Sequence, residues 1–141
     1  CSTKIDMPVW LSISCVMDEK NQRVMLGYND TIDKDTNVYE SLDDSITNFS
    51  KLHTGPILIA HSDIGVTGHA IKNAKKKFTG ILGAYPNKGY YEKPNWKFVE
   101  DITPDDYLKN AKNWVKDGVQ IIGGCCGIGP DFIKPLSELK K

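Results

Sequence analysis

The residues best suited to chemistry are two adjacent cysteines, Cys125 and Cys126, in the glycine-rich segment 122–130. Neighbouring side chains in a strand point to opposite faces, but flanking glycines allow a sharp turn that aims both sulfurs at one point. A bridge between adjacent cysteines would be strained, whereas cysteine thiolates are common zinc ligands. The pair therefore indicates a metal site, which two ligands alone do not complete. Simple packing of the two thiols is the alternative.

Polar residues also follow two other apolar segments. His61-Ser62-Asp63 comes directly after one, and Asn87 lies in the segment Tyr85-Pro-Asn-Lys-Gly89 after another. If the apolar segments are parallel strands, their carboxyl ends meet at one edge, which is where α/β folds bind ligands. We therefore expect these residues and the cysteine pair to share one rim. The alternatives are a hydrogen-bonded strand-end histidine and an ordinary turn at 85–89.

Four short apolar segments, each bounded by Gly, Pro or Asp, are typical of buried strands. These strands would position the residues described above. They are residues 8–15, 56–61, 81–85 and 119–122. A helical pattern follows each strand, and Ser41 and Thr103 are capping-box-like starts. The predicted helices run from these two residues to Gly55 and Gly118, over 66–78, and through 132–139, where Pro135 implies a kink or a late start. The residues between 17 and 40 predict a long connection with a small hairpin around 24–28.

This alternation of strands and helices predicts an α/β fold with a parallel sheet, because parallel strands need crossover connections. Two architectures satisfy the pattern. One is a small doubly wound open sheet, and the other is half of a (β/α)8 barrel, since a whole barrel needs about 250 residues. Only the site residues can distinguish them.

Composition limits the possible functions. The 141 residues include 18 Lys and Arg and 18 Asp and Glu, for a formal net charge of zero. We therefore expect no nucleic-acid partner and no binding to an anionic membrane. No apolar run approaches the roughly 18 residues of a membrane span. Four cysteines are too few for a secreted disulfide scaffold, so we expect a soluble, cytoplasmic protein, and a chain cut from something longer.

The motifs, taken together, resemble one known family. Ile122-Gly-Gly-Cys-Cys-Gly-Ile-Gly-Pro130, with Trp114-Val-Lys-Asp-Gly118, the 85–89 segment and Trp96 before it, resembles the carboxyl-terminal half of homocysteine S-methyltransferases. The resemblance covers nearly the whole chain. It implies a zinc-dependent (β/α)8 TIM barrel of which residues 1–141 supply strands five to eight, without the amino-terminal half. We therefore expect the barrel half rather than the open sheet.

The resemblance also implies a metal site. The family holds zinc with three cysteine thiolates, two of which correspond to Cys125 and Cys126. The third should fall in residues 59–63, where some relatives have His-Cys and this chain has His61-Ser62, so Ser62 occupies the expected ligand position. Serine is a far weaker zinc ligand than cysteine. His61 could substitute, since Cys2His is a known zinc set, but adjacent strand residues face opposite ways.

The function implied by the resemblance is zinc-dependent transfer of a methyl group from a small donor to L-homocysteine, forming methionine. The rest of the barrel would be the partner of this chain, and Asn87, at the rim, would help to orient the substrate. One alternative is a degenerate, non-catalytic homologue that keeps the fold and lacks a complete zinc site. Another is a small open-sheet binding module that is complete as it stands.

Overall fold

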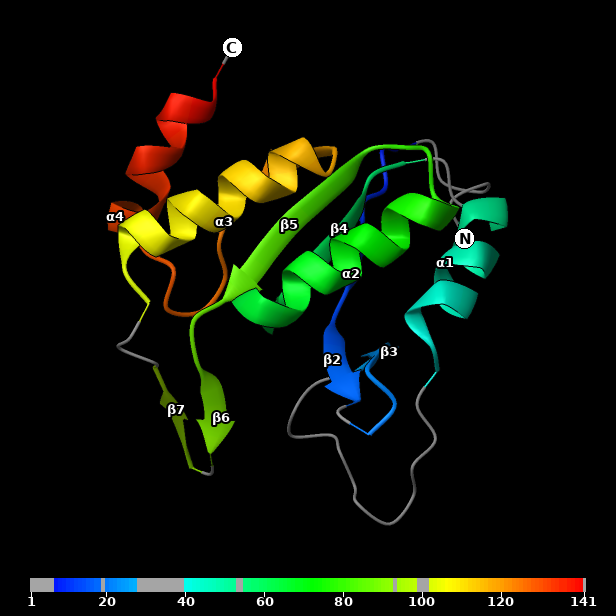
Figure 1. Cartoon of the computed structure of the whole chain (residues 1–141), viewed down its shortest axis with the longest axis horizontal. Coiled ribbons are helices and arrows are strands. Elements are labelled where there is room, and N and C mark those ends of the chain that lie inside the picture. Colours follow the sequence, from blue (N-terminus) through cyan, green and yellow to red (C-terminus); the bar gives the residue numbers. More distant parts are fainter. Residues whose placement is uncertain are drawn as a thin grey trace.

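The computed structural model describes residues 7–18, 20–27, 40–52, 55–92, 94–98 and 102–140. Its centre is a four-stranded parallel sheet (Figure 1). In sheet order the strands are β1 (Leu11–Ile13), β4 (Ile57–Asp63), β5 (Leu82–Asn87) and β8 (Val119–Ile122). Each strand pairs with the next one in chain order, so the series never reverses.

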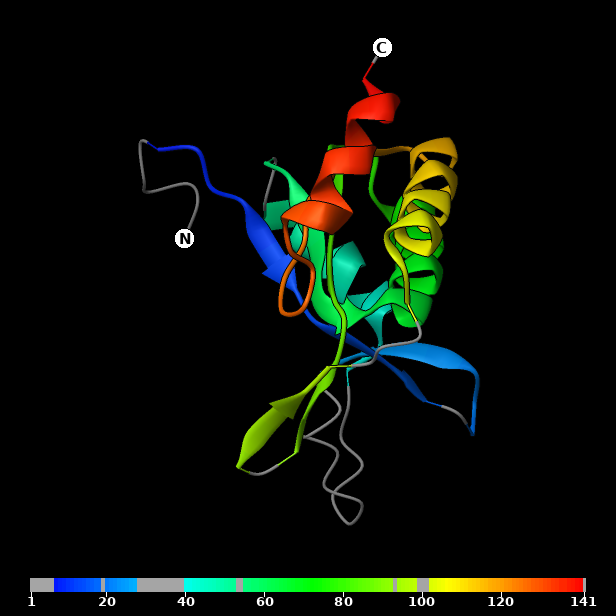
Figure 2. The same cartoon turned by 90° about the vertical axis from the view of Figure 1, so that its left-hand side faces the viewer.

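The helices connect these strands. They are α1 (Leu42–Leu52), α2 (Ile64–Lys77), α3 (Pro104–Lys116) and α4 (Pro130–Ile133), followed by a 3-10 helix, η3 (Lys134–Leu139). Helices α2 and α3 cover the same face of the sheet, and α1 packs beside α2 (Figures 1 and 2). Right-handed crossovers in an unreversed series place helices on one face, whereas a doubly wound sheet has them on both. The α/β prediction is confirmed, and the arrangement is compatible with part of a TIM barrel.

The two faces of the sheet differ in what covers them. Ile57, Ile59, Leu82 and Ala84 belong to the core beneath the helices. Because successive strand residues alternate between faces, the residues between them point the other way. There, a Cβ added to Gly83 would meet the side chains of Leu58 and Ile121 at 2.9 and 3.2 Å. Further along β5, Tyr85 is 41% exposed. The helix-free face is therefore apolar and closely packed around Gly83, and open at Tyr85.

Two hairpins project beyond the carboxyl end of the sheet (Figure 1). The first pairs β2 (Cys15–Asp18) with β3 (Arg23–Leu26), and the second pairs β6 (Tyr90–Glu92) with β7 (Asn95–Lys97). The expected single strand over 8–15 was wrong, because the chain leaves the parallel sheet after Ile13 and enters the first hairpin. The small hairpin expected around 24–28 exists but lies earlier in the chain, with its turn between Asp18 and Arg23, and residues 28–39 of the long connection lie outside the described residues. The second hairpin was not predicted.

Helix boundaries follow the predicted signals closely. Thr103 and Asp106 form a reciprocal capping box at the start of α3. Asp63 caps α2 by accepting a 2.7 Å hydrogen bond from the Gly65 amide, so this helix begins two residues before the predicted start. The irregularity expected at Pro135 is confirmed, since the α-helix ends at Ile133 and the chain continues as 3-10 helix.

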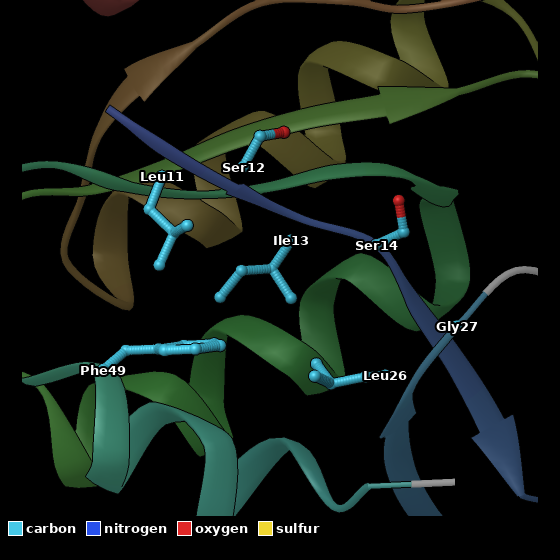
Figure 3. A pocket seen from close by; sticks show the side chains of 7 residues that line it. All are labelled: Leu11, Ser12, Ile13, Ser14, Leu26, Gly27 and Phe49. Carbon is cyan, nitrogen blue, oxygen red and sulfur yellow. The ribbon is translucent and has the colours of Figure 1, made fainter. Parts of the chain in front are cut away.

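A cavity of about 270 Å³ lies at the β1 edge of the sheet, beside α1 (Figure 3). Its lining is Leu11, Ser12, Ile13, Ser14, Leu26, Gly27 and Phe49. None of these residues belongs to the segments predicted to carry chemistry. In the described part of the chain, no helix has both the length and the apolar character of a membrane span.

Candidate metal centre

Three possible metal ligands converge at the carboxyl ends of β4 and β8. They are His61, Cys125 and Cys126, all half-buried, and their ligand atoms lie within 4.8 Å of one another. The Sγ atom of Cys125 is 3.5 Å from Nδ1 of His61 and 3.7 Å from Sγ of Cys126. Both cysteines are free thiols. The two sulfurs therefore point to one place, as the glycine-rich sequence led us to expect, without bonding to each other.

These distances fit a tetrahedral zinc site. Zinc bonds of about 2.3 Å to sulfur and about 2.0–2.1 Å to nitrogen place two sulfurs about 3.8 Å apart, and a sulfur and a nitrogen about 3.6 Å apart. Two of the three ligand separations match these values, and the third, from His61 to Cys126, needs at most a small side-chain adjustment. Two cysteines and one histidine form a known zinc set that leaves a fourth position for substrate. The residues present therefore fit the metal.

The cysteine pair is held by the backbone of β5. The Cys125 amide donates to the Pro86 carbonyl at 2.8 Å, and the Lys88 amide donates to the Cys126 carbonyl at 2.7 Å. The chain then turns, and the Ile128 amide donates to the Cys125 carbonyl at 3.1 Å. The third residue of this turn is Gly127, whose φ of 77° favours glycine. The turn explains why two adjacent sulfurs lie on the same side.

His61 reaches the cysteines because its backbone departs from regular strand geometry. The register of β4 against β5 shifts between Ala60 and Asp63, which marks a bulge. His61 itself has a φ of 51°, in the left-handed region that few residues other than glycine adopt. A bulge re-aims a side chain, so the alternation that argued against His61 does not apply here. Such local strain commonly accompanies a functional site.

Ser62, the position expected to supply the third ligand, has other partners. Its side chain is 1% exposed. Its hydroxyl donates to the Ala60 carbonyl at 2.8 Å and accepts from the Cys15 amide at 2.8 Å. Ser62 therefore joins β2 to the bulge of β4, next to the ligand group. The structure brings His61 to the cysteine pair and directs the Ser62 hydroxyl to the backbone.

Replacing Ser62 with alanine should destabilise the protein. The substitution leaves the buried Cys15 amide without its acceptor, which costs about 1–3 kcal/mol in the free energy of unfolding. Ser45→Ala is the matched control, because Ser45 is equally buried. Its hydroxyl donates to the Ser41 carbonyl, but the Ser45 amide donates to the same carbonyl, so the substitution leaves that carbonyl with a partner. We expect a loss below about 1 kcal/mol there. Denaturant unfolding measures both, and equal losses would contradict the role given to Ser62.

Asn87 lies at the rim, as expected, but its side chain is only 2% exposed. Its Nδ2 donates to the Gly89 carbonyl at 3.0 Å, at the start of the β6–β7 hairpin. Substrate orientation by Asn87 stays a prediction. The hairpin also brings Trp96 to His61, and the two rings form an edge-to-face contact with centroids 5.8 Å apart. The sequence marked Trp96 only as part of a motif, and its contact with the histidine was not foreseen.

Tyr107 of α3 is hydrogen-bonded to the segment that carries the cysteines. Its side chain is fully buried, and its hydroxyl donates to the Gly123 carbonyl. Burial, aided by nearby Tyr85, raises the pKa of Tyr107, so the phenol keeps its proton and remains a donor. Its place in the apolar stripe of α3 predicted core packing only. Sequence alone offers no signal for the hydroxyl's partner.

Burial also affects the thiols. It raises the pKa of the Cys126 thiol, and the hydrogen bond and charge of Cys125 act in the same direction. Metal binding must therefore displace a proton from Cys126. Burial raises the pKa of Cys15 to about 12, although a hydrogen bond with Ser62 opposes the shift. Cys15 is 3% exposed, which confirms the expected core position.

Comparison with protein-family models matches residues 1–139 to the family described as homocysteine S-methyltransferase. The chain belongs to this family. Homocysteine S-methyltransferase 3 of Zea mays is 34% identical over 55 residues, which are 37% of this chain and 16% of that protein. Selenocysteine methyltransferase of Astragalus bisulcatus is 28% identical over 68 residues, which are 46% of this chain and 20% of that protein. The resemblance to the family is thus confirmed, and the matched segments span a fifth or less of these relatives.

Proposed function

We propose that this homocysteine S-methyltransferase family member takes part in zinc-dependent transfer of a methyl group to the thiol of L-homocysteine, forming methionine. The observation that carries the proposal is the group of His61, Cys125 and Cys126, whose spacing fits three corners of a tetrahedral zinc site. The fourth corner would take the substrate sulfur. The names of the relatives in Zea mays and Astragalus bisulcatus support a thiol or selenol as the methyl acceptor.

The reaction requires few other functional groups from the protein. When bound, zinc would act as a Lewis acid that lowers the pKa of the substrate thiol and keeps its sulfur nucleophilic. The sulfur lone pair forms the new S–CH3 bond while the bond from the methyl group to the donor breaks, and its electrons stay with the donor. Catalysis would then be mainly positioning, in line with the breaking bond. The residues of this chain hold the metal and orient the acceptor.

We also propose that the chain supplies strands five to eight of a (β/α)8 barrel. The unreversed parallel series, the helices on one face and the ligands at the carboxyl ends of the strands support this. The helix-free face, with Tyr85 41% exposed, would then line the barrel interior opposite the remaining strands. The three described free thiols, at Cys15, Cys125 and Cys126, suit a reducing compartment such as the cytoplasm.

The test is to supply the full-length protein with zinc, L-homocysteine and S-methylmethionine or another small methyl donor. We expect methionine to form, and zinc removal by a chelator to stop its formation. One zinc should be present per protein. No methionine with any plausible donor, despite bound zinc, would refute the reaction. Less than about a tenth of an equivalent of zinc would instead favour the degenerate, non-catalytic homologue.

The zinc affinity of the protein should rise with pH, because the Cys125 and Cys126 thiols must each lose a proton to bind the metal. Burial raises the pKa of the Cys126 thiol, so this thiol keeps its proton around neutral pH and must release it to bind zinc, which contributes about tenfold per pH unit. We therefore expect the zinc affinity of the wild type to rise about tenfold more per pH unit than that of Cys126→Ser, between about pH 6.5 and about pH 8. Competition with a chelator of known pH dependence measures this, and a flat profile would argue against thiolate ligation.

A further inference from the structure

The β6–β7 hairpin extends over the ligand group from the end of β5. At its base Asn87 bonds to the Gly89 carbonyl, and Gly89, with a φ of 139°, leaves no room for a Cβ beside the Lys97 carbonyl. Trp96 on β7 contacts the His61 ring, and a Cβ added to Gly127 would meet the ring of Phe98 at 2.8 Å. The second half of the hairpin therefore contacts both His61 and the segment that carries the two cysteines.

We infer that Trp96 is a positioning residue, which holds the His61 imidazole in the orientation that places Nδ1 beside Cys125. This inference rests on the proposed zinc site. The two rings meet edge to face at 5.8 Å with an angle of 69°, a favoured geometry for aromatic pairs. Trp96 is half-buried, and its backbone pairs with Tyr91 of β6. It therefore restricts rotation of the histidine side chain.

His61 has more need of such support than the cysteines have. Its backbone lies in the left-handed region at a bulge, whereas both cysteines lie in a segment hydrogen-bonded to β5. An imidazole must also present one nitrogen to the metal in the correct plane, while a thiolate sulfur accepts a wider range of directions. Partners that orient a ligating histidine typically contribute about 10- to 100-fold to metal affinity. Loss of the Trp96 ring should fall in this range.

The experiment measures zinc affinity in the full-length protein by chelator competition, for Trp96→Ala and Trp96→Phe. We expect Trp96→Ala to weaken binding about 10- to 100-fold and Trp96→Phe, which keeps a ring, to stay within about threefold. Trp10→Ala controls for the loss of a tryptophan, because Trp10 is 56% exposed near the amino-terminal edge of the sheet. It should leave zinc affinity unchanged.

A second background separates positioning from folding. In His61→Cys the third ligand is a thiolate without a ring to orient, so adding Trp96→Ala should change affinity by less than about threefold. Equal losses in both backgrounds would show that the hairpin only stabilises the fold, and no loss in either would overturn the inference.

A readout that needs no metal keeps this inference distinct from the proposed function. In the metal-free protein, the NMR signals of the His61 ring should carry a ring-current shift from Trp96, which disappears in Trp96→Ala. If the wild type binds no zinc, the proposed metal site fails. Identical His61 signals with and without the Trp96 ring would then refute the positioning role separately.

Discussion

Serine in place of Cys125 or Cys126 should remove tight zinc binding. In structural zinc sites with four protein ligands, zinc binding contributes about 10–16 kcal/mol, which is about 3 kcal/mol for each ligand. Loss of one thiolate should therefore weaken affinity by more than about 100-fold, and a serine hydroxyl cannot replace it. Metal analysis after dialysis, followed by chelator competition, measures the loss.

Cys15→Ala is the matched control for these variants. Cys15 is also a free thiol, but it is buried in the core and does not belong to the metal group. Its replacement should lower the free energy of unfolding while bound zinc and affinity stay unchanged. If Cys125→Ser and Cys126→Ser each bound zinc with wild-type affinity, the metal would be held elsewhere.

His61→Asn should weaken zinc binding by more than about 100-fold as well, because it removes the third ligand. Asparagine is the right replacement, since it tolerates the left-handed backbone that His61 adopts at φ 51° and so leaves the bulge intact. His61→Cys should retain zinc within about tenfold of the wild type, because it supplies a third thiolate from the same place. Cobalt substitution would report the change, since the thiolate-to-metal absorption strengthens when a third sulfur binds.

Two further variants show whether position 61 or position 62 supplies the ligand. His69→Asn, on the exposed side of α2, should have no effect on zinc. Ser62→Cys should add no ligand, because the side chain at this position is directed to the Cys15 amide and the Ala60 carbonyl. A large gain in zinc affinity from Ser62→Cys, with no loss in His61→Asn, would return the third position to residue 62.

Regular elements were predictable because local signals and burial agreed. The apolar runs at 56–61, 81–85 and 119–122 became β4, β5 and β8, and Thr103 began α3 with a capping box. The β6–β7 hairpin could not be foreseen in the same way. Its strands have three residues each and run through charged and aromatic residues that show no clear alternation. It follows from contacts with the sheet end, which are not local in sequence.

The candidate site was predictable in its location and not in its geometry. Parallel strand ends share one edge whatever their side chains, so the meeting of the His61 segment with Cys125 and Cys126 required only the element order. Which of His61 and Ser62 faces the cysteines depends on a one-residue bulge at the end of β4. Regular alternation gave the opposite answer, because the modest tendency of histidine toward positive φ does not single out the one position that adopts 51°.

The unreversed order of the parallel strands has a consequence for how the chain acquires its structure. Among the four described strands, every parallel pairing joins a strand to the one before it in the series. Shorter separations between partners favour faster search. During synthesis, each strand-helix unit is therefore expected to dock on the one already formed, with His61 in place before Cys125 and Cys126 are translated.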